Sequence, residues 1–157
     1  MSNTENQSPN ENDIDKLYDK EKELAVFPCV LSIFPEFVFH KANPIVVGVH
    51  VHEGILRKNT PICIPGKNFM ELGVVTSIEK DHNQLEEAKQ GEDVCIEIVQ
   101  SPSKQQYMFG RQFDETDELV SKLTRESMGA LIRFYPDVCV KKDVYKLLMK
   151  LKKNFNI

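Results

Sequence analysis

The 157-residue sequence places a polar and basic segment, Lys67-Asn68-Phe69, between two strand-like runs. A lysine can neutralise a phosphate, an asparagine amide can hydrogen-bond a base edge, and a phenylalanine ring offers a stacking surface. Arg111 adds a guanidinium that can hold a phosphate through two parallel hydrogen bonds. These residue types indicate contact with RNA. The alternatives are that Phe69 closes the end of a barrel, and that Arg111 forms a salt bridge with Asp114 or Asp117.

Histidine and cysteine, the residue types that most often bind metals or act as nucleophiles, show no such arrangement in this sequence. His50 and His52 stand two residues apart, which places both imidazoles on one face of a strand, but no third ligand is fixed by the spacing. A solvated strand face explains this pair better than a metal site. Cys29, Cys63 and Cys95 lie within strand-like runs, where a thiol behaves as a small buried hydrophobe. We therefore predict no catalytic residue, no metal site and no cofactor.

The composition is typical of a globular domain with one core, since 41% of the residues are hydrophobic and 28% are charged. The net charge is −4, from 24 acidic and 20 basic residues. No apolar run is long enough to span a membrane, and the first 23 residues lack the apolar region of a signal peptide. The cysteines form no CxxC pair, which indicates a reduced chain. We therefore expect a cytoplasmic monomer without membrane contact.

Residues 25–123 read as short strands separated by proline and glycine. The strand-like runs are 26–33, 45–52, 61–65, 72–78 and 94–98. In the second run Val47, Val49 and Val51 share one face, which should be buried, and the two histidines share the other. Runs at this spacing, without long helices between them, indicate a small antiparallel barrel or sandwich.

After residue 123 the apolar period changes from two to that of a helix. One helix should begin after Thr124 as N-cap and end at Tyr135, because Pro136 follows. A second helix should have Asp143 as its N-cap and pack through four apolar residues, Val144, Leu147, Leu148 and Leu151. At the other end of the chain, residues 1–12 should be a disordered tail, and residues 13–24 a charged lead-in that is helical or flexible.

The second of these helices also carries a basic stripe. Lys146, Lys150 and Lys153 fall at i, i+4 and i+7, and Tyr145 and Met149 lie beside them, again four residues apart. Lysines beside an apolar floor suit a short peptide in which acidic and aliphatic residues alternate. The alternative is a solvated lysine face on a helix that only packs.

Several segments, taken in order, resemble one family. They are LAVFPC (24–29), NPIVVGV (43–49), KNF (67–69), GVVTSIE (73–79), MFGR (108–111) and DELVSKLTRES (117–127). Together they resemble the C-terminal region, the fourth domain, of eukaryotic and archaeal translation initiation factor 5B, a relative of bacterial initiation factor 2. The resemblance covers residues 24–157.

The resemblance implies a small closed antiparallel β-barrel, of the type found as the second domain of translational GTPases. The barrel should end with a strand near residues 119–123, followed by two short C-terminal helices. In the family this module holds the acceptor end of initiator methionyl-tRNA while the ribosomal subunits join, and its helices receive the acidic tail of initiation factor 1A. The tRNA contacts would then fall on Lys67, Asn68, Phe69 and Arg111. The peptide contacts would fall on Tyr145, Lys146, Met149, Lys150 and Lys153.

The family's GTPase domain has no counterpart in this sequence. Residues 65–68 superficially resemble a phosphate-binding loop, but no serine or threonine follows Lys67, and no guanine-recognition or switch motif occurs. We therefore expect a non-catalytic module that contacts RNA, the ribosome and a second factor. The rival interpretation is a protein-interaction barrel that does not bind RNA, because residues 24–137 carry a net charge of −5.

Overall fold

After the N-terminal helix α1, the order of elements follows the organisation that the sequence predicts, with the strands before the C-terminal helices. The computed structural model describes residues 10–157. Its strands are β1 Cys29–His40, β2 Ile45–Arg57, β3 Pro61–Ile64, β4 Met70–Lys80, β5 Asn83–Leu85, β6 Glu87–Lys89, β7 Asp93–Val99 and β8 Glu118–Ser121. Its helices are α1 Glu11–Lys22, the short 3-10 helix η2 Pro65–Lys67, α2 Arg125–Phe134, α3 Pro136–Cys139 and α4 Lys142–Phe155.

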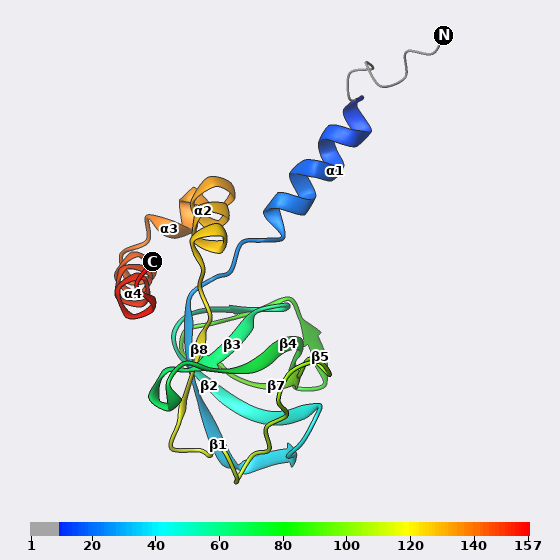
Figure 1. Ribbon diagram of the computed structural model, residues 1–157, viewed down its shortest axis with the longest axis vertical. Coiled ribbons are helices and arrows are strands. Elements are labelled where there is room, and N and C mark those ends of the chain that lie inside the picture. Colours follow the sequence, from blue (N-terminus) through cyan, green and yellow to red (C-terminus); the bar gives the residue numbers. More distant parts are fainter. Residues whose placement is uncertain (1–9) are drawn as a thin grey trace.

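Six of these strands close into an antiparallel barrel (Figure 1). The strand order is β1-β8-β3-β4-β7-β2, and β2 pairs with β1 to complete the circle. The two shortest strands extend this barrel, β5 by pairing with β4 and β6 by pairing with β2. The predicted fold class, a closed antiparallel barrel followed by C-terminal helices, is confirmed.

Alternation along the strands fills the barrel interior. Val47, Val49 and Val51 of β2 are fully buried, as their shared face predicts, and meet the buried Ile96 and Ile98 of β7. The same alternation corrects the prediction for Cys95: its neighbours in β7 point inward, so this thiol faces outward and is only partly buried. Cys29 and Cys63 are buried, as expected.

Strand β1 is longer than the run 26–33 that the sequence predicts. It begins at Cys29 and continues past Pro35 to His40. Between the pairs Ile33↔Val49 and Val38↔Val47, β1 advances five residues while β2 advances two, so the intervening residues bulge outward. Proline has no N–H to give to a ladder, and a bulge is one of the few places where a strand tolerates it.

A second apolar cluster joins the helices to the outside of the barrel. Phe27, Val30 and Val120 contribute from the barrel side, and Met128 and Leu131 contribute from α2. The four apolar residues predicted to pack the last helix, Val144, Leu147, Leu148 and Leu151, are all buried. Helix α4 lies so close to β2 that a Cβ added to Gly54 would be 2.8 Å from the Leu147 side chain.

The boundaries of α2 agree with those that the sequence predicts, whereas the start of α4 differs. Thr124 caps α2 through a capping box with Ser127, and α2 ends at Phe134, before Pro136. That proline instead starts the short helix α3, which was not expected from the sequence. The predicted N-cap of α4 is wrong: Lys141 occupies that position, and Asp143 lies in the first turn.

Helix α1 projects away from the barrel and touches the helical layer at its C-terminal part (Figure 1). Tyr18 packs edge-on against Phe134, and Glu21 Oε2 lies 2.8 Å from Arg133 Nη1. Asn10 caps α1, so Glu11 and Asn12 belong to a helix and not to a disordered tail; residues 1–9 of that predicted tail lie outside the described residues. None of the helices within residues 10–157 is long and apolar enough to cross a membrane.

Candidate functional site

The two loops that hold the predicted RNA-contacting residues lie at one end of the barrel. Strands β3 and β8 pair antiparallel, Ile62 with Ser121 and Cys63 with Val120, so the end of β3 lies beside the start of β8. The turn η2, which ends at Lys67, follows β3 directly, and residues 108–117, which include Arg111, precede β8. The barrel topology thus brings Lys67-Asn68-Phe69 and the Arg111 loop to the same rim.

Asn68 and Phe69 are held in an unusual backbone conformation at this rim. Both have left-handed φ angles, 59° and 57°, which asparagine tolerates and phenylalanine rarely adopts. The Phe69 ring does not enter the barrel end. It packs instead against Phe155 in the last turn of α4, with ring centroids 5.2 Å apart, and remains 39% exposed. Phe69 therefore links the rim to the helical layer while keeping part of its ring open.

The charges at the rim are mixed. Lys67 lies near enough to Asp114 to help lower the pKa of that carboxyl, although the larger cause is hydrogen bonding from Thr116 to the carboxylate. Arg111 forms no ion pair with any residue of the described chain, so the alternative of a salt bridge to Asp114 or Asp117 is not realised. Arg111 is therefore the rim cation with a guanidinium open to a ligand.

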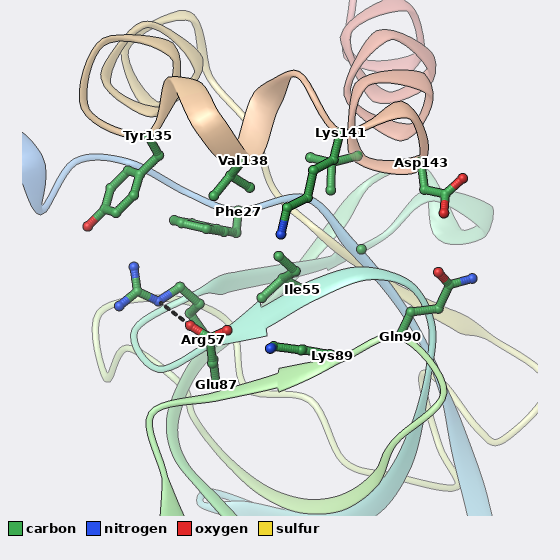
Figure 2. Close-up of a pocket in the computed structure, with 12 residues that line it drawn as sticks. Phe27, Ile55, Arg57, Glu87, Lys89, Gln90, Tyr135, Val138, Lys141 and Asp143 are labelled. Carbon is green, nitrogen blue, oxygen red and sulfur yellow. Dashed lines mark ion pairs between the residues drawn. The ribbon is translucent and has the colours of Figure 1, made fainter.

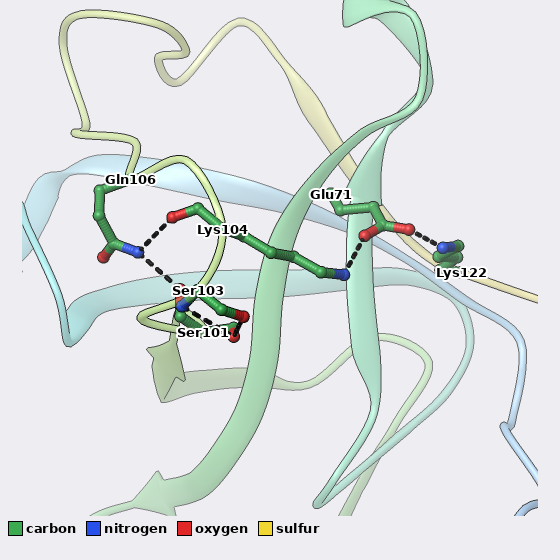
Figure 3. Close-up of polar contacts among 6 residues, drawn as sticks. All are labelled: Glu71, Ser101, Ser103, Lys104, Gln106 and Lys122. Atoms are coloured by element: carbon green, nitrogen blue, oxygen red, sulfur yellow. Dashed lines mark hydrogen bonds and ion pairs between the residues drawn. The ribbon is translucent and has the colours of Figure 1, made fainter.

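A neighbouring set of polar contacts fixes the loop after β7 (Figure 3). Glu71 of β4 pairs with Lys104, at 2.7 Å between Oε2 and Nζ, and also with Lys122 just beyond β8. Gln106 donates from Nε2 to the carbonyls of Ser101 and Lys104, at 2.7 and 3.1 Å. These two lysines are thus engaged by one carboxylate, which holds the loop against the barrel wall.

The predicted basic stripe on α4 faces away from the packed side of the helix. Lys146, Lys150 and Lys153 are exposed, and Lys150 Nζ lies 3.9 Å from Glu53 Oε2 of β2. Tyr145 is 54% exposed, whereas Met149 packs against the second apolar cluster. Of the two apolar residues expected to form a peptide-binding floor, Tyr145 is the more open.

A cavity of about 390 Å³ separates the barrel from the turn between α3 and α4 (Figure 2). Arg57 stands on its wall, with its guanidinium carbon 4.8 Å from the Phe27 ring centroid and 5.6 Å from that of Tyr135. Glu87 lies 3.9 Å from Arg57, and Lys141 points into the same space from the helical side. Stacking of one guanidinium on two rings stabilises the junction between barrel and helices.

Three aromatic side chains that were not expected from the sequence line an open groove of about 810 Å³ on the outside of the barrel. These are Phe34, Phe37 and Phe39 of the bulged part of β1, and we call the space they line the aromatic groove. The signal was present, because Phe34 and the pair Phe37 and Phe39 stand at positions of opposite parity, so a regular strand cannot turn all three rings toward the interior. The predicted strand ends at residue 33, before all three rings.

The histidine pair adjoins the aromatic groove. His50 Nδ1 lies 2.6 Å from Asp93 Oδ1, and the rings of His50 and His52 meet edge-on at 4.8 Å. Within residues 10–157 no group of three or more histidine, cysteine, aspartate or glutamate side chains is arranged to hold a metal ion. The buried thiols are poor nucleophiles, because burial raises the pKa of Cys29 to about 11 and that of Cys63 to about 12.

Comparison with known proteins decides the family. The family model described as elongation factor Tu domain 4 matches residues 27–120, which is most of the barrel. The chain belongs to this domain 4 family. Eukaryotic translation initiation factor 5B of Pongo abelii is 45% identical over 139 residues, and that of Homo sapiens is 46% identical over 136 residues. The predicted relationship to initiation factor 5B is confirmed.

A solved structure extends the likeness of this domain 4 chain to the helices. The crystal structure of GDP-bound aIF5B from Aeropyrum pernix superimposes with a TM-score of 0.71, covers 91% of the chain and is 26% identical. The Pongo abelii match spans 88% of this chain but 11% of that protein, and the Aeropyrum pernix match spans 23% of that chain. The family model that matches is that of domain 4, and the chain spans about a tenth of the length of the initiation factor 5B of Pongo abelii.

Proposed function

We propose that this domain 4 chain binds the single-stranded acceptor end of initiator methionyl-tRNA during ribosomal subunit joining in the cytoplasm. The observation that carries the proposal is the convergence of Lys67-Asn68-Phe69 and Arg111 on one barrel rim. Arg111 forms no ion pair with any residue in 10–157, so its guanidinium can take a phosphate, and the open part of Phe69 supplies a stacking face. The relatives are initiation factors, which supports an RNA ligand of this kind.

The test measures how tightly the unmodified chain and its variants bind a tRNA acceptor-stem hairpin that carries a single-stranded CCA end. Arg111→Ala should weaken binding and reduce the slope of log affinity against log salt by about 0.7 to 0.9 for each phosphate that is no longer bound. Lys16→Ala, an exposed lysine on α1, serves as the matched control. Lys67→Ala should act in the same direction as Arg111→Ala.

The opposite result has a clear meaning. If the double variant Lys67→Ala/Arg111→Ala binds the hairpin like the unmodified chain at every salt concentration, the rim is not an RNA site. The chain would then be a protein-interaction barrel, which the position of Asp114 beside Lys67 favours as the second candidate.

The same proposal gives α4 a protein partner, the acidic tail of initiation factor 1A. Tyr145, Lys146, Met149, Lys150 and Lys153 would bind it, with the lysines steering the tail and the exposed Tyr145 packing against its aliphatic residues. A labelled tail peptide should bind the intact chain, and Lys146→Ala/Lys153→Ala should weaken this binding at low salt more than at high salt. Lys16→Ala is again the control. If Lys146→Ala/Lys153→Ala binds the tail peptide as tightly as Lys16→Ala does, α4 has a packing role alone.

A further inference from the structure

The loop after β7 carries a short pattern that the proposed RNA and peptide contacts do not use. Ser101 is followed directly by Pro102, and Lys104 stands three positions after the serine. Proline-directed protein kinases recognise a serine in this setting, because an apolar pocket accepts the proline ring and an acidic site binds the lysine. The pattern therefore indicates an acceptor for phosphate.

Serine or threonine precedes proline at two other places in the sequence, and each lacks one of these features. Thr60 is 2% exposed and donates its hydroxyl to the Arg57 carbonyl, so a kinase cannot reach it. Ser8 has an acidic residue, Glu11, three positions later. Ser101 is exposed, as are residues 102–106. Accessibility and charge together thus select Ser101.

The loop presents this serine on a tip that can open without disturbing the barrel. Residues 101–104 form a turn, closed by a hydrogen bond of 3.1 Å from the Lys104 N–H to the Ser101 carbonyl. The Ser101 hydroxyl lies 2.9 Å from that of Ser103, in the same turn. At the neck of the loop, the buried Gln100 side chain accepts from the Tyr107 N–H at 2.7 Å and donates to the Tyr107 carbonyl at 2.8 Å. The neck is therefore fixed, while local contacts hold the tip.

The wall of the barrel beside Ser101 carries positive charge. Glu71, Ser101, Lys104 and Lys122 line one hollow of about 170 Å³. Both lysines pair with the Glu71 carboxylate (Figure 3), so two positive charges and one negative charge leave a net charge of +1. A serine phosphate carries a charge between about −1.5 and −2 at pH 7 and has three strong acceptor oxygens. A phosphate on Ser101 would therefore meet ammonium groups that neutralise much of its charge.

We propose that Ser101 is phosphorylated by a proline-directed serine kinase and that the phosphate then docks on Lys104 and Lys122. In the transfer, the Ser101 Oγ attacks the γ-phosphorus of ATP, and a bond forms between them while the bond from that phosphorus to ADP breaks. The hydroxyl proton passes to the catalytic carboxylate of the kinase, and ADP leaves. The phosphate then takes the Lys104 ammonium from Glu71 and shares Lys122 with it. These residues belong to neither the rim site nor the α4 stripe, so this proposal stands apart from the proposed function.

The first experiment incubates the folded chain with ATP and a purified cyclin-dependent kinase, an enzyme of the proline-directed class. Mass spectrometry of the intact chain and of its fragments should place the first phosphate on Ser101, and Ser101→Ala should not acquire it. Lys104→Ala should slow incorporation about tenfold, because the kinase loses the charge that it binds. Ser103→Ala is the matched control: it alters the neighbouring exposed hydroxyl, keeps the pattern and should be phosphorylated like the unmodified chain.

The second experiment follows the docking of the phosphate by phosphorus NMR titration of the phosphorylated chain. The second pKa of the phosphate should be lower in the folded chain than in concentrated urea, because nearby ammonium groups favour the dianion. Lys122→Ala should raise this pKa in the folded chain and leave it unchanged in urea, since Lys122 is distant in sequence and meets the phosphate only in the folded barrel. Lys16→Ala, on α1, should leave it unchanged in both.

Two results would overturn the proposal. One is a folded chain in which Ser101 stays unmodified after incubation with the kinase, whether the phosphate goes to Ser8 or to no residue. The other is an equal second pKa of the phosphate in the unmodified chain and in Lys122→Ala, because the phosphate would then lie in solvent and not on the barrel wall.

Discussion

Phe69, which follows η2, and Phe155, in the last turn of α4, are in direct ring contact, with centroids 5.2 Å apart and planes inclined by 51°. The contact joins two parts of the chain that the sequence presents as independent sites. The rim that carries Lys67 and the helix that carries the lysine stripe are therefore in direct contact. A shift of α4 would therefore move Phe69, and with it the proposed RNA site, through the contact between these two rings.

The first prediction concerns the strength of this contact. In a double-mutant cycle, Phe69→Ala and Phe155→Ala should show a coupling free energy of about 0.5 to 1.5 kcal/mol, the range for tilted aromatic pairs. Urea unfolding of the four proteins measures it. A coupling of zero would mean that the two rings contribute independently and that the rim is not braced by α4.

The second prediction concerns Gly54, where β2 passes beneath α4. A Cβ there would lie 2.0 Å from the Pro28 carbonyl oxygen, and the φ of +77° already disfavours a side chain. Gly54→Ala should lower the free energy of unfolding by about 2 to 5 kcal/mol, from backbone strain and overpacking together. Gly91→Ala is the matched control, because Gly91 has a φ of +90° but open space around it. If both variants lose a similar amount of unfolding free energy, backbone strain alone explains the loss and overpacking contributes nothing.

The third prediction is a gain in stability. Gly129 lies in the interior of α2 with no atom within 4 Å of an added Cβ. Gly129→Ala should therefore raise the free energy of unfolding by about 0.5 to 1 kcal/mol, the difference between the two helix propensities. Thr124→Ala in the same helix should lower it by about 1 kcal/mol through removal of the cap. Chemical denaturation distinguishes the expected increase from the expected decrease. A lower stability of Gly129→Ala would contradict the prediction that this position accepts a side chain.

The fourth prediction concerns alkaline pH. Burial raises the pKa of the Cys29 thiol to about 11 and that of the Cys63 thiol to about 12, from an ordinary value of 9.0. The folded chain holds these protons more tightly than the unfolded chain, so this contribution to stability is complete below pH 9 and is lost as the pH rises toward 11 and 12. The free energy of unfolding should fall over that range. Cys63→Ala, although less stable at neutral pH, should show a smaller fall, and an identical fall would contradict the assignment.

Local patterning explains why much of the fold is predictable from the sequence. Val47, Val49 and Val51 show a period of two that only a half-buried strand satisfies, and the barrel buries them. Thr124 followed by Ser127 gives α2 its start, and Pro136 limits its end, because caps and prolines act within a few residues. Such features depend on neighbours in sequence, which is why they can be read without the structure.

The features that could not be predicted depend on contacts between distant residues. Nothing near Phe69 indicates that its ring meets Phe155, since that contact exists only after α4 has packed on β2. The proline at position 35 predicts the end of a strand where the structure has a bulge, because register belongs to a pair of strands and not to one of them. Lys141, and not Asp143, is the N-cap of α4, because α3 ends at Cys139 with Val140 as its C-cap and α4 begins at Lys142.

Closure of the barrel has a consequence for how the protein behaves at high concentration. Each of its six strands has a neighbour on both sides, so no long row of unpaired N–H and C=O groups is available to template another chain. The edges that remain belong to β5 and β6, which are three residues long, and β6 carries Glu87 and Lys89. Short charged edges are poor seeds for cross-β growth. We expect the folded chain to resist fibril formation, and aggregation to require that the barrel first opens between two of its strands.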